Sequence, residues 1–116
     1  MSVIVYGIPN CDTVKKARSW LDAQGIAYTF HDYKKRGADP AQLAAWCAAA
    51  GWDKVLNRAG TTFRKLPEAD RAELDTARAI ALMALQPAAI KRPVVEHPGG
   101  LLIGFNPGAW AAAFEC

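Results

Sequence analysis

Apolar residues near the N-terminus first form a continuous run and then recur at helical spacing. Residues 3–6 are apolar and rich in β-branched side chains, which predicts a short buried strand closed by Gly7. Over residues 12–24 most apolar positions recur every three or four residues and Gly25 follows, so a helix is expected there. Residues 26–33 show apolar alternation and predict a second strand. Together the three segments predict a βαβ unit with two parallel strands.

A basic loop over residues 34–38 leads to a second helix. Asp39 is the expected N-cap, Pro40 occupies the first helical position, and Gly51 ends the helix. The apolar stripe of this helix consists of Leu43, Trp46, Cys47 and Ala50. Such a stripe predicts that one side of the helix is buried.

Residues 52–90 contain few strand signals and two further helical patches, one over residues 62–66 and a longer one over residues 75–86. The apolar residues of the longer patch that can face a core are Ile80, Leu82 and Met83. We therefore expect a single domain that carries a helical insertion over about residues 38–88.

The C-terminal part predicts two strands and a helix. Residues 94–96 and 101–103 flank a turn signal at residues 97–100, which indicates an antiparallel hairpin. Asn106 and Pro107 then cap a last helix, which packs the aromatic residues Trp110 and Phe114. The order βαβ, helices, ββα predicts an α/β fold with a mixed four-stranded sheet and helices on both faces.

The composition is that of one globular domain. Of the 116 residues, 52% are hydrophobic and 22% are charged, which suffices for one core and argues against disorder. The net charge of +3 comes from scattered basic residues. A small anionic ligand is enough to account for it, and neither nucleic acid nor a membrane is an expected partner. Because no signal peptide or long apolar run is present, we expect a cytoplasmic protein.

The three cysteines, Cys11, Cys47 and Cys116, are an odd number at long spacings, which does not suggest a disulfide framework. Reduced thiols in a reducing compartment fit this pattern better. Cys47 lies on the apolar stripe of its helix and is expected to be structural. Cys116 is interpreted as incidental, although a terminal position leaves it open as a resolving thiol.

Cys11 lies between a predicted strand and a predicted helix, which is a position where a thiolate is easily stabilised. Backbone N–H groups from Asn10 onward can surround the sulfur, and Lys15 adds positive potential one turn further on. The negative charge of Asp12, next to Cys11 in the chain, disfavours the thiolate. The alternative is a small buried core cysteine. Because Val14 stands where a Cys-x-x-Cys motif has its second cysteine, a Cys11 adduct needs an external thiol or a distant cysteine to resolve it.

Two basic segments are candidates for binding an anion. Residues 57–65 combine three positive charges, including Arg58, with hydroxyls and a glycine, but a solvated loop explains them equally well. Arg92 directly precedes Pro93 at a predicted strand start, where a cis bond is one way to enter the strand. The pairing of that strand with the first one predicts that Arg92 lies at the same edge of the sheet as Cys11, although a surface arginine is the alternative.

No metal site is expected, because His31 and His97 lack metal-ligand spacing. No serine-hydrolase elbow and no phosphate-loop or dinucleotide motif is present either.

Three segments in this order resemble the arsenate reductase (ArsC) and Spx family: residues 7–18, residues 57–66, and residues 91–94 with Gly104 and Phe105. Within the family the chain is most similar to the YffB-like branch. The resemblance implies a thioredoxin-like fold with a helical insertion. By motif match, Cys11 takes the place of the nucleophile, Arg58 and Arg92 take those of two anion-binding arginines, and Pro93 resembles the family's cis-proline. It also implies that glutathione resolves the adduct on the nucleophile and that glutaredoxin completes the cycle.

The chain departs from the glutathione-coupled arsenate reductases at one strand. Those enzymes carry a further arginine after the hairpin turn, whereas residues 101–105 hold no positive charge here. The loss of one charge-assisted contact weakens binding of a doubly charged oxyanion by roughly 1.5 to 3 kcal/mol. Arsenate is therefore one candidate substrate among others.

These observations lead to a hypothesis with two rivals. We expect a glutathione-dependent thiol oxidoreductase with no bound cofactor, in which Cys11 attacks an oxidised thiol or an oxyanion and glutathione is the co-substrate. The first rival is a true arsenate reductase. The second is a non-enzymatic, Spx-like regulator that binds RNA polymerase, although such regulators usually carry the Cys-x-x-Cys switch that Val14 removes.

Overall fold

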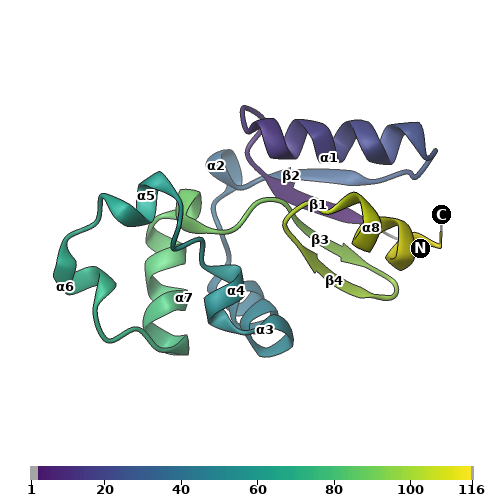
Figure 1. The fold of residues 1–116 in the computed structure, drawn as a ribbon. Helices are drawn as coiled ribbons and strands as arrows, with labels where there is room; N and C mark the ends of the chain where they lie inside the picture. The colour runs from purple at the N-terminus through teal and green to yellow at the C-terminus, as the bar shows by residue number, and fades with distance from the viewer. Residues whose placement is uncertain (1–2, 116) are drawn as a thin grey trace. The chain divides into compact units, whose positions relative to one another are not determined.

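A computed structural model describes residues 3–115 of the protein, so Cys116 lies outside the described residues. The chain forms two compact units. The first, called the sheet unit, contains residues 3–33 and 92–115, and the second, called the helical unit, contains residues 34–91. Figure 1 labels the elements of both units, and each unit is described by itself.

The sheet unit contains the mixed sheet expected from the sequence. Its elements are β1 (Ile4–Gly7), α1 (Asp12–Ala23), β2 (Thr29–Asp32), the start of α2 (Tyr33–Arg36), β3 (Val94–His97), β4 (Gly100–Ile103) and α8 (Pro107–Phe114). The four strands have the order β2-β1-β3-β4. β1 and β2 are parallel, whereas β3 is antiparallel to both β1 and β4. The predicted βαβ unit and hairpin are therefore confirmed.

The second strand is shorter than predicted, because the end of α1 takes up its first residues. The N–H of Gly25 donates to the carbonyl of Asp22 at 3.1 Å, and the N–H of Ile26 donates to that of Leu21 at 3.0 Å. This pair of bonds is a Schellman motif, and the positive φ of 71° at Gly25 is the conformation it requires. Ile26 therefore closes the helix, and β2 begins only at Thr29.

The far end of the second strand also differs from the prediction. β2 ends at Asp32, and Tyr33 is the first residue of the short helix α2. The predicted basic loop over residues 34–38 is thus helical as far as Arg36. A single helical turn is too short to show a 3.6-residue period, which is why the pattern did not indicate it.

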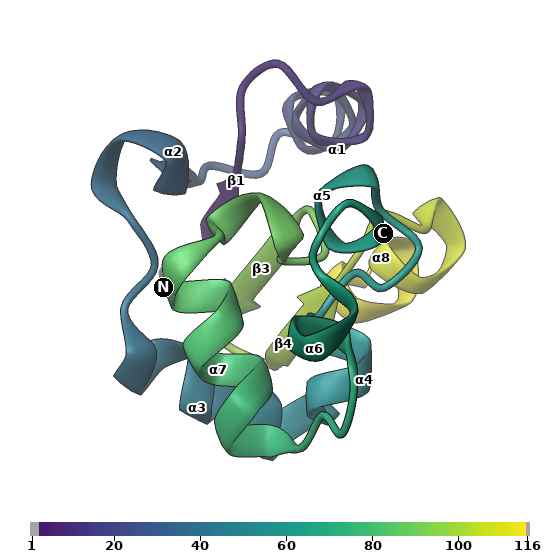
Figure 2. The ribbon, with the colours of Figure 1, turned by 90° about the vertical axis from the view of Figure 1, so that its left-hand side faces the viewer.

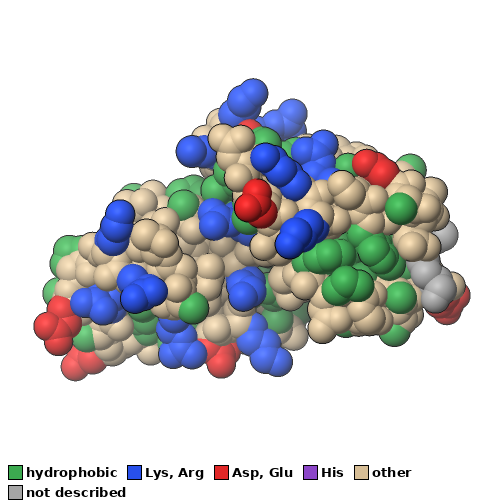
Figure 3. Space-filling model, turned by 45° about the horizontal axis from the view of Figure 1, so that its top comes forward, with side chains coloured by type: hydrophobic (Ala, Val, Ile, Leu, Met, Phe, Trp, Pro, Cys, Tyr) green, Lys and Arg blue, Asp and Glu red, His purple; other side chains and the backbone are tan. Residues whose placement is uncertain are grey.

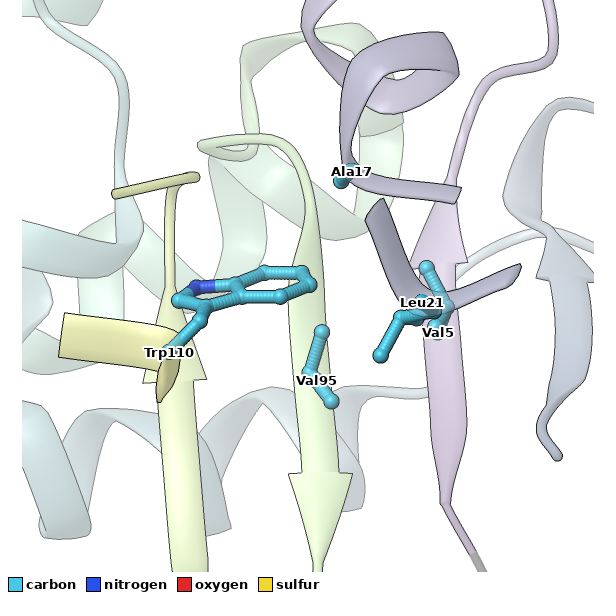
Figure 4. Close-up of a cluster of buried hydrophobic side chains, with 5 residues drawn as sticks. All are labelled: Val5, Ala17, Leu21, Val95 and Trp110. Atoms are coloured by element: carbon cyan, nitrogen blue, oxygen red, sulfur yellow. The ribbon is translucent and has the colours of Figure 1, made fainter. Parts of the chain in front are cut away.

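The core of the sheet unit lies between one face of the sheet and two helices. Side chains that are at most 1% exposed meet there: Val5 of β1, Val95 of β3, Ala17 and Leu21 of α1, and Trp110 of α8 (Figure 4). Val5 and Val95 are direct partners in the antiparallel ladder and so point to the same face. Within this unit, α1 and α8 therefore cover the same face of the sheet.

The helical unit is built from short helices around α3 and α7. Its elements are α3 (Pro40–Ala50), α4 (Trp52–Val55), α5 (Thr61–Arg64), α6 (Glu68–Arg71), α7 (Thr76–Leu85) and the 3₁₀-helix η1 (Pro87–Ala89). Figure 2 shows α7 beside α3 and α4. The side chains buried there include Leu43, Trp46, Cys47, Ala79 and Met83, whereas Ile80 and Leu82 are half-buried. The sequence pattern missed α4, α6 and η1, which are single turns.

The predicted N-caps are confirmed by side-chain hydrogen bonds. The Asp39 carboxylate accepts from the N–H of Ala41 at 3.0 Å, and the Asn106 amide oxygen accepts from the N–H of Ala109 at 3.1 Å. Each bond satisfies a backbone donor that has no partner inside the helix. The caps explain why α3 and α8 begin at Pro40 and Pro107.

Replacing Asn106 by alanine is expected to lower the free energy of unfolding by about 1 kcal/mol, because the N–H of Ala109 loses its acceptor. Urea denaturation followed by circular dichroism measures this change. Ser19→Ala is the matched control, since Ser19 is exposed in the middle of α1. Equal midpoints for Asn106→Ala and the unchanged protein would contradict a stabilising cap.

Candidate active site

A tight turn places Cys11 at the start of α1. The N–H of Cys11 donates to the carbonyl of Ile8 at 3.2 Å, which closes a turn with Pro9 in its second position. Cys11 is the N-cap, with extended backbone angles, and its carbonyl accepts from the N–H of Lys15 at 2.9 Å. The amides of residues 12–14 therefore open the helix without intrahelical acceptors. The half-buried, unbridged thiol of Cys11 lies where the helix favours an anion.

Gly7 and Val14 fix how closely the strand approaches the helix at this turn. A Cβ atom at Gly7 would lie 2.9 Å from Cγ2 of Val14, so the close contact requires glycine. The Val14 side chain is fully buried. The position where a second cysteine would stand thus belongs to the core.

The strand register brings three chain segments to the same end of the sheet. The β1–β2 ladder ends with the pair Gly7 and Asp32, and the β1–β3 ladder ends with the pair Tyr6 and Val94. Because β1 and β2 are parallel and β3 is antiparallel, the residues after β1 and β2 meet those before β3. The turn that carries Cys11 lies at this end, as the sequence predicts.

Tyr33 and Arg92 flank the end of β1 from its two neighbouring strands. Tyr33 follows β2 directly, and its side chain is only 1% exposed. Its hydroxyl has no hydrogen-bond partner within the described part of the chain. Burial raises the pKa of Tyr33 above its ordinary value; Arg92 opposes this rise and Cys11 adds to it. The Tyr33 hydroxyl therefore interacts electrostatically with both Cys11 and Arg92.

The sequence pattern indicates no role for Tyr33, because it places the residue at the end of a predicted strand. One available signal was its place directly after the carboxyl end of a parallel strand, where α/β proteins bind ligands.

Arg92 is half-buried, and the Arg92–Pro93 peptide bond is cis, the isomer that the resemblance implies. Pro93 is buried, and its carbonyl accepts from the N–H of Gly104 at 2.8 Å. This bond joins the segment before β3 to the residue after β4. The sheet unit therefore brings Cys11, Tyr33, Arg92 and Pro93 together.

The remaining candidates have simpler surroundings. Asn10 and Lys15 flank Cys11 in the chain and are exposed. Arg58 belongs to the helical unit, in a turn closed by the N–H of Gly60 donating to the carbonyl of Asn57 at 3.2 Å. Its guanidinium lies 5.4 Å from the ring centre of Trp52, a cation–π contact. The anion-binding roles of Asn10, Lys15 and Arg58 stay predictions.

Other polar residues have partners unrelated to this site. The His31 ring packs against Tyr6 at 5.0 Å, and the His97 ring packs against Phe114 at 5.2 Å. No group of three metal-binding side chains occurs in residues 3–115. Cys47 is buried in α3, and burial raises the pKa of its thiol, which fits the structural role expected for it.

On the face shown in Figure 3, Lys and Arg side chains occur at several separate places, and Asp and Glu side chains lie among them and near the edges of the view. Every helix within residues 3–115 falls short of the length and apolar character that a membrane-spanning helix requires.

The chain belongs to the ArsC family, whose model matches residues 6–113. Among solved structures it is similar to a protein named YFFB, with 60% identity, a TM-score of 0.94, and 97% of this chain and 98% of the other covered. It is also similar to an arsenate reductase (ArsC) related protein from Brucella melitensis, with 54% identity, a TM-score of 0.77, and 100% and 97% of the two chains covered. The fold is thus thioredoxin-like.

A regulator is also among the relatives. The global transcriptional regulator Spx of Listeria innocua is 26% identical over 106 residues, which are 90% of this chain and 80% of the regulator. The family match and the relatives support assigning this chain to the thiol oxidoreductase-like proteins.

Proposed function

We propose that this protein is a glutathione-dependent thiol oxidoreductase with Cys11 as its nucleophile. The observation that carries the proposal is the position of Cys11 at the N-terminus of a 12-residue helix, at the same sheet end as Arg92. The first supplies amides and the helix dipole for a thiolate. The second supplies a cation for an anionic substrate. The match to the ArsC family supports the same chemistry.

The reaction needs two thiol–disulfide exchanges at Cys11, the first with the mixed disulfide and the second with free glutathione. In the first, the Cys11 thiolate attacks the glutathione sulfur of a mixed disulfide, so that a Cys11–glutathione disulfide forms and the other thiol leaves as a thiolate and takes up a proton. In the second, a glutathione thiolate attacks the glutathione sulfur of that adduct and releases Cys11. The mixed disulfide gains two electrons, and its glutathionyl group and one free glutathione become one glutathione disulfide. Glutaredoxin is a candidate partner for the second step, and a reducing compartment such as the cytoplasm suits the cycle.

Arg92 is assigned to binding the anionic substrate or the carboxylates of glutathione. We expect Arg92→Ala to raise the KM for a glutathionylated substrate by about one to two decades, because one charge-assisted contact of 1.5 to 3 kcal/mol is lost. Arg92→Lys recovers part of the loss, since it keeps the charge without the planar fork. Steady-state kinetics over a range of substrate concentrations measures both. Lys16→Ala is the control, because Lys16 is exposed on α1. A KM that Arg92→Ala leaves unchanged would remove Arg92 from the site.

A comparison of two substrates tests the proposed function directly. Purified protein is supplied with glutathione, and consumption of NADPH by glutathione reductase is followed with either a glutathione mixed disulfide or arsenate as the oxidant. Turnover of the mixed disulfide supports the proposed reaction. Turnover of arsenate alone would replace it by arsenate reduction, and turnover of neither would refute the enzyme assignment.

Two alternatives follow from specific observations. The similarity to an arsenate reductase (ArsC) related protein favours arsenate as a substrate. Against it, residues 101–105, which include most of β4, hold no positive charge to bind the oxyanion. The similarity to Spx favours a regulator that binds RNA polymerase. A pull-down with the Cys11→Ser variant distinguishes the regulator from the enzyme. Retention of RNA polymerase by this variant supports the regulator, because such binding needs no thiol chemistry.

A further inference from the structure

The Tyr33 hydroxyl is buried beside a reactive group and has no bond that explains its presence. Buried tyrosine hydroxyls usually have a hydrogen-bond partner, since an unpartnered one loses its hydration without compensation. Here the side chain is 1% exposed and the hydroxyl has no partner among residues 3–115. A phenylalanine would fill the same space without this cost. An unpartnered polar group of this kind requires an explanation.

The surroundings of the hydroxyl indicate what it binds. It interacts electrostatically with Cys11 and with the Arg92 guanidinium, yet it is not hydrogen-bonded to either. Tyr33 and Arg92 follow and precede the two strands that flank β1, and Cys11 follows β1 itself. The three groups therefore surround the same end of the central strand, and the buried hydroxyl has no hydrogen-bond partner there among residues 3–115.

We propose that the Tyr33 hydroxyl donates a hydrogen bond to an anionic oxygen of the ligand that binds beside Cys11 and Arg92. The proposal deepens the proposed function and rests on it, because it names the chemistry that the same site selects. A phenol is protonated near neutral pH and burial raises the pKa of Tyr33 further, so the group acts as a donor. A bond from O–H to a charged oxygen is among the stronger hydrogen bonds in proteins. Tyr33 thus selects ligands that carry a carboxylate or a tetrahedral oxyanion.

Alkylation of Cys11 by two reagents of similar shape tests the inference without any turnover. Iodoacetate carries a carboxylate, whereas iodoacetamide carries a neutral amide. In both reactions the Cys11 thiolate forms an S–C bond, the C–I bond breaks and iodide leaves with the electron pair. We expect Tyr33→Phe to slow modification by iodoacetate about threefold or more and to leave the rate with iodoacetamide unchanged. Mass spectrometry of the peptide that contains Cys11 measures both rates.

Tyr28→Phe is the matched control. Its hydroxyl accepts a hydrogen bond from Nε of Arg18 at 3.1 Å and has no part in the site, so the ratio of the two rates should stay as it is in the unchanged protein. Thermal unfolding is measured in parallel, and Tyr33→Phe should unfold at the same temperature or a higher one. An unfolding temperature of Tyr33→Phe well below that of the unchanged protein would overturn the inference, because the hydroxyl would then have a structural partner. Equal slowing of both reagents, or of neither, would also overturn it.

Protection of Cys11 against alkylation distinguishes the two sources of the anionic oxygen, an inorganic oxyanion and a glutathione carboxylate. Inorganic phosphate and S-methylglutathione are each added before iodoacetamide. Protection by phosphate that Tyr33→Phe weakens assigns an inorganic oxyanion, and protection by S-methylglutathione that Tyr33→Phe weakens assigns a glutathione carboxylate. If Tyr33→Phe weakens neither, the inference is wrong. Because these measurements need no reductase activity, they remain decisive even if the enzyme assay fails.

Discussion

Replacing Cys11 by serine is expected to lower the rate of glutathione mixed-disulfide reduction by about a thousandfold or more. Serine keeps the size of the side chain at the N-cap of α1 and is a good capping residue, so the fold is retained. Its hydroxyl stays protonated near neutral pH and is a poor nucleophile toward sulfur. The assay coupled to NADPH oxidation measures the loss, and circular dichroism verifies the fold.

Cys47→Ala is the control for this experiment. Cys47 is buried in α3 of the helical unit, and burial raises the pKa of its thiol, so the substitution should leave turnover intact. Cys116→Ser addresses the terminal cysteine as a resolving thiol. Activity that survives in Cys11→Ser would remove Cys11 from the chemistry. Activity lost in Cys116→Ser would give the second exchange to a thiol of this chain instead of glutathione.

Replacing Trp110 by alanine is expected to destabilise the protein by about 3 to 5 kcal/mol. The side chain is 1% exposed, and its ring packs against Phe105 at 4.9 Å and Trp20 at 5.9 Å between ring centres. Its indole N–H donates to the carbonyl of Gly104 at 3.1 Å. The variant therefore has both a cavity beside the sheet and an unpartnered carbonyl. Denaturation with guanidinium chloride measures the loss.

Leu85→Ala is the control for the loss of apolar volume. Leu85 is 81% exposed at the end of α7, so its removal should change the free energy of unfolding by about 0.5 kcal/mol or less. A Trp110→Ala variant as stable as Leu85→Ala would show that the aromatic cluster in the sheet unit does not hold that unit together.

The sequence predicted best those elements whose ends carry strong local signals. Gly25, Asp39 and Asn106 each have a capping role that depends on few neighbours, and the structure has each in that role. The first buried strand was evident because a run of β-branched residues favours a strand and the glycine after it ends the run. The βαβ unit and the hairpin followed from short connections and from the parallel pairing that a crossover helix produces, whereas the pairing of β1 with β3 joins distant segments.

What the sequence could not give depends on contacts between distant segments. Ile26 has the pattern of a strand residue, yet its N–H is used to close α1, and an apolar residue suits both states. Tyr33 likewise continues an apolar pattern, and only the strand register shows that it stands beside Cys11 and Arg92. Cys11 and Arg92 were predictable because their residue types carry chemistry. A tyrosine at the end of an apolar strand carries no such signal.

The buried side chain of Val14 has a consequence for timing. Proteins with two neighbouring thiols release a bound thiol by a reaction within the molecule, whose rate does not depend on concentration. Here the corresponding position is filled by a valine packed against Gly7. Under the proposed mechanism, a glutathionylated Cys11 persists until another thiol molecule collides with it. The lifetime of the adduct is then inversely proportional to the concentration of free thiol, so the occupied fraction of the protein reports how much reductant the cell has left.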